Sequence, residues 1–560
     1  MIKGKFVGIM FKRYILLNIL LFSLFPCILP AQEALKSAEE EYYDFLALQG
    51  LTERPTLNYR TLSDSVWKIA DDTEHLWQGQ NMGTWQNSFG NFRMKAYGPE
   101  LFTSVNTAAP YGQNDGVLWQ GRGFNALLKG GVRFEGYGVE LTLLPHFAFS
   151  QNMEFETIPS AYSGPDFAER AEKYGYYGVW GIDAPQRFGD KPFFDWDFGD
   201  SEIRYTWKTL TIGFGTQPIW LGPAQLNPII HSNNAASYPK LDIGLRRQPM
   251  ILPKRNLYIG DIEFRTWLGC LSESDWFDND NSNDHNLITG FSIAYSFPSL
   301  LKGLTIGFNR IMLSKWNNMN FGSVFTLFFP NMYGMGFGND EADQRASIII
   351  DYLLPIAGIN IYLEWGRNDF SSGIDPTFRY PFHTEAYTIG VKKSLSISTT
   401  LKGEILLELT KLDCSQDYDR LLTWYSTFYA HHLITQGHTN RGQWLGAGIG
   451  TGGNSQYLGF KLYFPRGYGS LFIQRRNPDL DYTWFIHSKN PDGYNPEWSI
   501  RTFFDIGLSG QYFFKPNLSA SGSFTFRDEH NPLNKSSAPD SSVSEHRFNI
   551  HIAASVKYSF

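Results

Sequence analysis

The last fourteen residues, 547–560, alternate between two kinds of side chain. Every second residue is apolar or aromatic: Phe548, Ile550, Ile552, Ala554, Val556, Tyr558 and Phe560. The residues between them are polar, except Ala553. A β-strand sends alternate side chains to opposite faces, so this segment predicts a strand with one apolar and one polar face. Such a strand faces lipid in a transmembrane β-barrel or is half-buried in a soluble β-sandwich, and its length favours the barrel.

The composition agrees with a barrel and gives no sign of a nucleic-acid partner. Aromatic residues make up 16% of the chain, charged residues only 18%, and there are 53 glycines. This mixture suits strands, tight turns and the aromatic girdles of membrane barrels. The net charge is −7 and no basic tract stands out. Beyond the N-terminus no apolar run reaches the length of a membrane-spanning helix. Because backbone groups cannot go unpaired in lipid, a membrane protein with this sequence must form a closed barrel.

The N-terminal part predicts a leader and then a small helical segment. A basic stretch, an apolar core and a cleavage-site sequence indicate a signal peptide over residues 1–31. From Glu33 to Gln49 apolar residues recur at helical spacing, and Gly50 is a natural helix stop. We therefore expect residues 32–90 to form a mainly helical segment. It would lie beneath or inside the barrel lumen, or remain a loosely attached periplasmic tail.

Residues 91–560 predict an all-β fold, a transmembrane barrel of about 18 antiparallel strands. Strands in one direction should start near Asn91, Gly138, Thr209, Asn256, Gly303, Gly358, Thr399, Tyr468 and Asn517. Return strands should start near Gly121, Ser201, Lys240, Leu287, Arg345, Ala386, Tyr457, Arg501 and His546. Counted back from the C-terminus, eleven links are alternately long and short, whereas residues 248–255 form an intermediate one. Short links of outer-membrane barrels are periplasmic and long ones extracellular. The prediction is thus an outer-membrane protein of a diderm bacterium, with periplasmic termini and extracellular long loops.

Charged residues within the predicted strands fall on the polar face. They are Glu364, Glu404, Glu408, Asp505, Arg547 and Lys557. A Lys or Arg on the lipid face near the bilayer midplane costs about 2–4 kcal/mol, so these side chains should point into the lumen. There they would form a solvated wall or contribute to selectivity.

The stretch 217–240, QPIWLGPAQLNPIIHSNNAASYPK, interrupts the strand pattern. Its prolines and Asx residues predict an ordered, turn-rich loop. Trp220 offers a flat apolar face, and the amides of Asn233 and Asn234 both donate and accept hydrogen bonds. An aromatic face with amides suits sugar binding, but the same residues could instead fix the loop to the barrel wall. The candidate glycan-binding or loop-structuring residues are Trp220, Gly222, Pro223, Ser232, Asn233 and Asn234.

This loop resembles the signature region of the capsule assembly Wzi family. The resemblance rests on Trp220-x-Gly222-Pro223, Ser232-Asn233-Asn234-Ala235 and Tyr238-Pro239, and further upstream on Arg54-Pro55 and Tyr59-Arg60. Ala224 stands where we would expect a second glycine, and Ala avoids φ values that Gly reaches. The resemblance implies an outer-membrane lectin that binds capsular or other surface polysaccharide and helps attach and assemble it. It also implies a lumen blocked by N-terminal helices and inward-folded loops. The implied partners are surface polysaccharide, outer-membrane lipid and polysaccharide export machinery.

Other functions have weaker support in the sequence. A porin or sugar-uptake channel is the main alternative, because a barrel of this size is wide enough for water. No GxSxG, HExxH or CxxC motif indicates an enzyme, and we expect no cofactor or metal. The acidic residues 278–284 fail the EF-hand pattern. Cys270 and Cys414 could form a disulfide or remain two thiols. The long loops are rich in aromatic residues, among them Tyr176, Tyr177, Trp424, Tyr429 and Tyr482, which would stack on sugars or fold the loops over the barrel mouth.

Overall fold

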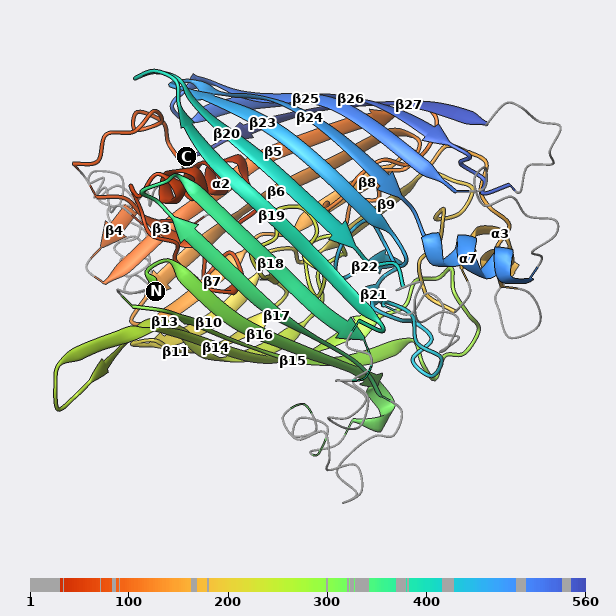
Figure 1. Cartoon of the computed structure of the whole chain (residues 1–560), viewed down its shortest axis with the longest axis horizontal. Helices are drawn as coiled ribbons and strands as arrows, with labels where there is room; N and C mark the ends of the chain where they lie inside the picture. The colour runs from red at the N-terminus through yellow and green to blue at the C-terminus, as the bar shows by residue number, and fades with distance from the viewer. Residues whose placement is uncertain are drawn as a thin grey trace, which may run out of the picture.

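A computed structural model shows a closed antiparallel β-barrel of eighteen strands (Figure 1). It describes residues 31–33, 35–70, 72–82, 87–89, 91–162, 169–178, 181–298, 301–319, 322, 327, 342–368, 379, 382–414, 428–489, 500–535 and 545–560. The predicted signal peptide therefore lies almost entirely outside the described residues. The barrel closes where the last strand, β27 (His546–Tyr558), pairs with the first, β5 (Phe92–Asn106).

Each strand pairs with its neighbour in the sequence. The remaining strands are β6 (Gly123–Gly136), β7 (Val139–Leu143) with β8 (His146–Ser150), β9 (Phe193–Asp197) with β10 (Glu202–Trp207), β11 (Leu210–Gly215), β13 (Lys240–Leu252), β14 (Leu257–Ser272), β15 (His285–Ser296), β16 (Leu304–Lys315), β17 (Ala342–Leu354), β18 (Ile359–Asn368), β19 (Glu385–Ser396), β20 (Lys402–Lys411), β23 (Asn454–Phe464), β24 (Gly467–Asn477), β25 (Thr502–Lys515) and β26 (Leu518–His530). β7 and β8 are one strand of the barrel, interrupted at Pro145, which has no N–H to donate to the ladder. The next strand is also interrupted, and its pieces β9 and β10 pair with β8 and β7 respectively. A short β4 (Asn87–Phe89) pairs with the start of β5.

Links between strands alternate in length around the whole barrel. The short ones are 137–138, 208–209, 253–256, 297–303, 355–358, 397–401, 465–466 and 516–517. The intermediate link predicted at 248–255 is wrong, since β13 and β14 extend and leave only residues 253–256 between them. The C-terminus and the short links lie at one end of the barrel (Figure 1, left), which we call the turn end. The long links lie at the other, the loop end, with α3 (Glu169–Tyr174) and α7 (Leu480–Lys489).

The outward face of the wall is apolar and the inward face is polar. On β27, Ile552 is 52% exposed, whereas its inward neighbours Ala553 and His551 are buried. The same alternation places Leu407 outside and Glu408 inside on β20. Among the residues that the structure describes, no helix is long and apolar enough to cross a membrane.

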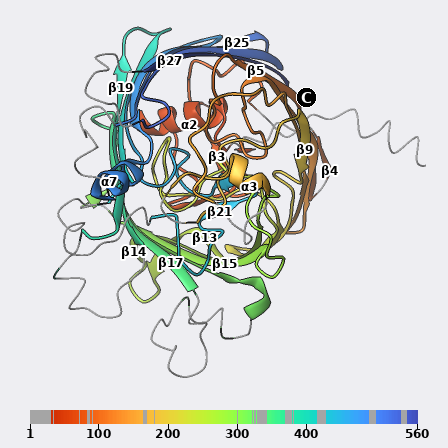
Figure 2. The same ribbon diagram turned by 90° about the vertical axis from the view of Figure 1, so that its right-hand side faces the viewer.

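The N-terminal segment lies inside the lumen (Figure 2). It contains one helix, α2 (Ala38–Leu48), so within its described residues it is less helical than the sequence periodicity suggests. The side chain of Ser37 caps this helix by accepting from the N–H of Glu40 at 3.2 Å. The rest is turns with the short strands β1 (Ala31–Glu33), β2 (Tyr59–Arg60) and β3 (Val66–Lys68). β1 pairs with β3, and the backbone N–H groups of residues 57–59 donate to Glu263 on the barrel wall, so these residues do not continue a helix.

Ion pairs and aromatic contacts fix α2 to the wall. Asp44 of α2 accepts from Arg54 at 2.6 Å and from Lys392 of β19 at 2.7 Å, and Arg54 reaches Asp351 of β17 at 2.6 Å. Burial pushes the pKa of Asp44 up, but the charges of Arg54 and Lys392 outweigh it and hold that pKa well below its usual range. Phe45 of α2 packs on Tyr463 of β23 with ring centroids 4.6 Å apart, and Tyr42 stacks on Trp77 of the same segment at 4.1 Å.

Candidate functional site

The loop 217–240 folds inward from the loop end and joins the N-terminal segment in the lumen. Its strand β12 (Trp220–Leu221) pairs antiparallel with β2. The backbone N–H of Gly222 donates to the backbone and side-chain oxygens of Asn58 at 3.2 and 2.9 Å. Gly222 has φ +83°, a value that favours glycine. Ala224 is absent from the positive-φ positions of the described chain, so alanine is accommodated there without strain. We call loop 217–240 with segment 35–82 the plug.

Glutamates on the barrel wall hold the plug by its backbone. Glu408 accepts hydrogen bonds from three consecutive N–H groups, those of residues 225–227, at 2.7–3.2 Å. Glu263 of β14 accepts in the same way from residues 57–59 at 2.7–3.0 Å. Glu364 accepts from the N–H of Ile229 at 2.9 Å. A buried carboxylate is costly unless such charge-assisted bonds satisfy it, and here each one orders a turn of the plug.

This arrangement corrects one sequence prediction. Glu364, Glu404, Glu408 and Asp505 point inward as expected, but they do not form a solvated wall. All are buried, because the plug and neighbouring side chains cover them. The sequence shows only that these charged residues occupy inward-facing strand positions. That pattern is the same whether water or a folded segment fills the lumen beside them.

Trp220 lies inside the plug, away from solvent. Its ring is fully buried, with the Lys36 ammonium 4.0 Å and the Arg60 guanidinium 5.8 Å from the ring centroid. Its Nε1 donates to the backbone oxygen of Ala224 at 3.0 Å. Burial lowers the pKa of Lys36 to about 8. The face of Trp220 is therefore occupied by the protein's own cations.

His231 and Ser232 are both used within the protein. The ring of His231 lies 2.8 Å from the backbone oxygen of Ile219 through Nδ1 and 2.8 Å from the Tyr238 hydroxyl through Nε2. Burial lowers the pKa of His231 to about 4, so the ring is neutral at pH 7. The Ser232 hydroxyl donates to the backbone oxygen of Gly446 at 2.7 Å.

Asn234 joins the plug to two other loops. Its Nδ2 donates to the backbone oxygen of Trp444 at 3.0 Å, in the loop 412–453. Its Oδ1 accepts from the backbone N–H of Asn114 at 2.9 Å, in the loop 107–122. The backbone oxygen of Asn233 accepts from Gly116 at 3.0 Å. Three loops distant in sequence thus converge on this pair of asparagines.

Further amides gather at this junction, and we call the group the amide cluster: Gln113, Asn114, Asn227, Asn233 and Asn234. Gln113 donates to the Asn227 side chain at 2.6 Å, and Asn114 donates to the backbone oxygen of Leu226 at 3.0 Å. Within the described part of the chain, the side-chain oxygens of Asn114 and Asn233 are buried and accept no hydrogen bond. Such acceptors usually find a water or ligand donor. No sequence pattern predicts that Gln113 and Asn114 belong to this cluster, because only the fold brings the loop 107–122 next to the loop 217–240.

Several aromatic residues in the described parts of the loops are used in packing. Tyr429 is fully buried and its hydroxyl donates to the backbone oxygen of Ile229 at 2.8 Å. Tyr176 and Tyr177 are buried too, and Tyr482 packs against Tyr177 with ring centroids 5.0 Å apart. Trp444, beside the amide cluster, is only partly buried. Trp424 and the other residues of 415–427 lie outside the described residues. Among the described residues, Cys270 and Cys414 are not joined by a disulfide.

Comparisons with known proteins point to one family. The family model of the capsule assembly protein Wzi matches residues 138–537. Wzi of Escherichia coli, described as a carbohydrate-binding outer-membrane β-barrel involved in group 1 capsule assembly, aligns with a TM-score of 0.58 at 11% identity, over 95% of this chain and 100% of that one. Acinetobacter baumannii OccAB2 aligns with a TM-score of 0.38 at 9% identity, over 83% of this chain and 98% of that one.

No curated protein sequence matches this chain. At 11% identity the likeness to the solved Wzi structure shows a shared fold. The family model is more specific, because its match runs from β7 to beyond β26 and includes the loop 217–240. The chain is a member of the Wzi capsule assembly family.

Proposed function

We propose that this barrel lies in the outer membrane, binds a surface polysaccharide at its loop end, and helps attach and assemble that polymer on the cell. Family membership and the carbohydrate-binding activity of the solved Wzi structure support this proposal. The observation that carries it furthest is the amide cluster, in which the half-buried side chains of Asn114 and Asn233 hold covered, unused acceptor oxygens beside the partly exposed Trp444. Sugar hydroxyls are donors that match such acceptors.

The six residues of the sequence-based site divide into two roles under this proposal. Trp220, Gly222, Pro223 and Ser232 shape the plug, whereas Asn233 and Asn234 join three loops at the amide cluster. The plug keeps the three loops in register, so the cluster is pre-organised before polymer binds. With the short links in the periplasm, as in other outer-membrane barrels, the loop end faces outward and meets polymer that arrives from the export machinery.

The plug also bears on the porin alternative. A diffusion pore needs a water-filled passage, but side chains on the inner face of β14 to β20 are covered by plug residues. We therefore favour a binding protein over a channel.

The test in cells is where the polysaccharide is found. Deletion of the gene should move the host's polysaccharide from the cell pellet to the culture medium, and wild-type protein should restore retention. The double variant Asn114→Ala/Asn233→Ala should restore it poorly. Asn517→Ala, at the turn end where its amide reaches the Tyr558 hydroxyl at 2.9 Å, is the control and should restore it fully. Unchanged retention in the deletion strain would refute the proposed function.

A further inference from the structure

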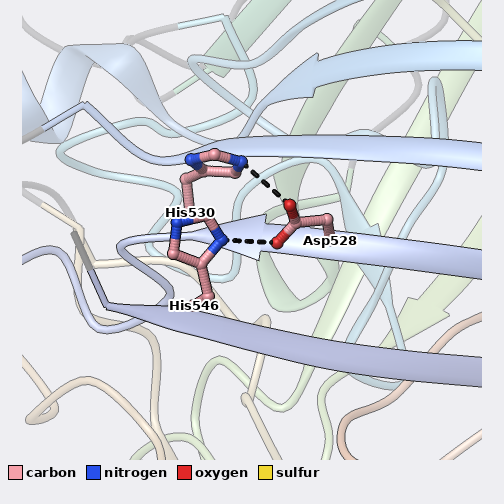
Figure 3. Close-up of side chains that lie close together, drawn as sticks. All are labelled: Asp528, His530 and His546. Atoms are coloured by element: carbon pink, nitrogen blue, oxygen red, sulfur yellow. Dashed lines mark hydrogen bonds and ion pairs between the residues drawn. The ribbon is translucent and has the colours of Figure 1, made fainter. Parts of the chain in front are cut away.

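Two histidines and an aspartate meet at the loop end of the last hairpin, outside the plug and the amide cluster (Figure 3). His530 ends β26 and His546 begins β27, and the two are directly opposite in the strand register. Their ring centroids lie 4.0 Å apart. Asp528 is two residues before His530, so its side chain lies on the same face of the strand.

The carboxylate of Asp528 lies between the two rings. One of its oxygens is 3.1 Å from Nε2 of His530, and the other is 2.8 Å from Nδ1 of His546 (Figure 3). One ligand atom from each residue can be chosen so that all three lie within 4.8 Å of one another. The three side chains are 24–34% exposed, so an ion from solution can reach them.

Aromatic residues fix the position of this group. Phe548, directly opposite Asp528 in the strand register, stacks on Phe526 on the outward face with ring centroids 5.7 Å apart, and lies 6.0 Å from the ring of His546. Phe504 of β25 meets the ring of His530 edge-on at 5.5 Å. The group therefore stands on the outer surface of the barrel, at the edge of the apolar wall. Its rings are held by neighbours on three strands, which limits the rearrangement that ion binding requires.

We propose that Asp528, His530 and His546 form a binding site for Zn²⁺ or a similar first-row divalent ion. Two imidazoles and one carboxylate are a typical ligand set for such ions, whereas Mg²⁺ and Ca²⁺ prefer oxygen ligands alone. Around Zn²⁺ with ligand distances of about 2.0–2.1 Å, tetrahedral ligand atoms are about 3.3 Å apart. The two Asp–His distances, each to a different carboxylate oxygen, need to open by only a few tenths of an ångström, and the other distances among the three ligand atoms, at most 4.8 Å, need to shorten to about 3.3 Å.

Ion binding has a structural consequence. The ion displaces the protons that the imidazoles now share with Asp528, and ties β26 to β27 at the last paired residues of the hairpin. Three protein ligands leave one position of a tetrahedral site for water. The site depends on neither the polysaccharide nor the plug.

The test is calorimetric titration of the untagged, detergent-solubilised, full-length mature protein with ZnCl₂, and separately with CaCl₂. We expect one Zn²⁺ per chain, Zn²⁺ affinity at least tenfold weaker in His530→Gln and in His546→Gln, and no comparable binding of Ca²⁺. His285→Gln is the matched control, because His285 lies at the loop end of β15 and outside this group. It should bind Zn²⁺ as the wild type does.

A second readout separates ion loss from misfolding. Each variant should keep the heat-modifiable electrophoretic mobility of a folded barrel, and Cu²⁺ bound to the wild type should show two nitrogen ligands by electron paramagnetic resonance. Absence of Zn²⁺ binding by the folded wild type would overturn the proposal. So would Zn²⁺ affinity that both histidine variants retain.

Discussion

At the scale of single residues, buried carboxylates explain how the lumen is filled. Each of Glu263 and Glu408 gathers three successive backbone N–H groups that would otherwise be unsatisfied inside the barrel. An unpaired buried N–H group costs about 1–3 kcal/mol. One glutamate side chain thus supplies the hydrogen-bond acceptors that a neighbouring strand would provide, because a turn in the lumen has no strand beside it.

Glu408→Gln should destabilise the plug. The amide keeps one acceptor oxygen but loses the charge and presents an N–H₂ group to backbone donors. We expect a loss of about 2–4 kcal/mol, because hydrogen bonds to charged groups contribute about 1.5–3 kcal/mol each. Urea unfolding in detergent measures it. Glu53→Gln is the control, since that side chain is 87% exposed, and an equal loss there would contradict our account.

His231 should make the plug sensitive to acid. Its pKa is lowered to about 4, whereas an unfolded histidine titrates near 6.5. Between these values the unfolded state binds more protons, so the free energy of unfolding falls as pH decreases from about 6.5 to 4, by up to about 3 kcal/mol. Unfolding at pH 7.5 and pH 4.5 tests this. His231→Gln should flatten the dependence over that interval, and an unchanged slope would show that other groups dominate.

At the scale of elements, strand positions follow from the sequence but the plug does not. Alternating apolar residues and short Pro- and Gly-containing turns predict where β16 to β27 start, because each signal is local. The contacts of Trp220, Asn114 and Trp444 join segments far apart in sequence, and no local pattern encodes them. Loop 217–240 was recognisable as ordered, but only the fold shows that Trp220 faces Lys36 and Arg60.

Asp44→Asn should release helix α2 from the wall. The change removes one partner of Lys392, which keeps Glu404, and one partner of Arg54, which keeps Asp351. Breaking a buried ion pair on one side costs about 3–5 kcal/mol. We expect faster proteolysis within residues 35–50 of the folded barrel, measured by mass spectrometry. Cleavage no faster than in wild type would mean that aromatic packing around Tyr42 and Trp77 alone holds the helix.

At the scale of the whole molecule, the apolar outer wall requires a membrane. Ile552 on β27 and Ile397 in a short link are equally exposed, at 52% and 51%. Ile552→Lys should destabilise the barrel in lipid by about 2–4 kcal/mol, because a cation near the bilayer midplane is costly. Ile397→Lys, outside the span, should have little effect. Refolding into vesicles at increasing urea measures both, and equal effects would contradict the membrane placement.

The central claim is that the folded loop end binds polysaccharide through the amide cluster. Its most direct test is binding of the purified barrel in detergent to the host's own purified surface polysaccharide, immobilised on a sensor. We predict saturable binding by the wild type and by Asn517→Ala, and at least tenfold weaker binding by folded Asn114→Ala/Asn233→Ala. Absence of saturable binding by the wild type, or equal binding by the double variant, would contradict this account.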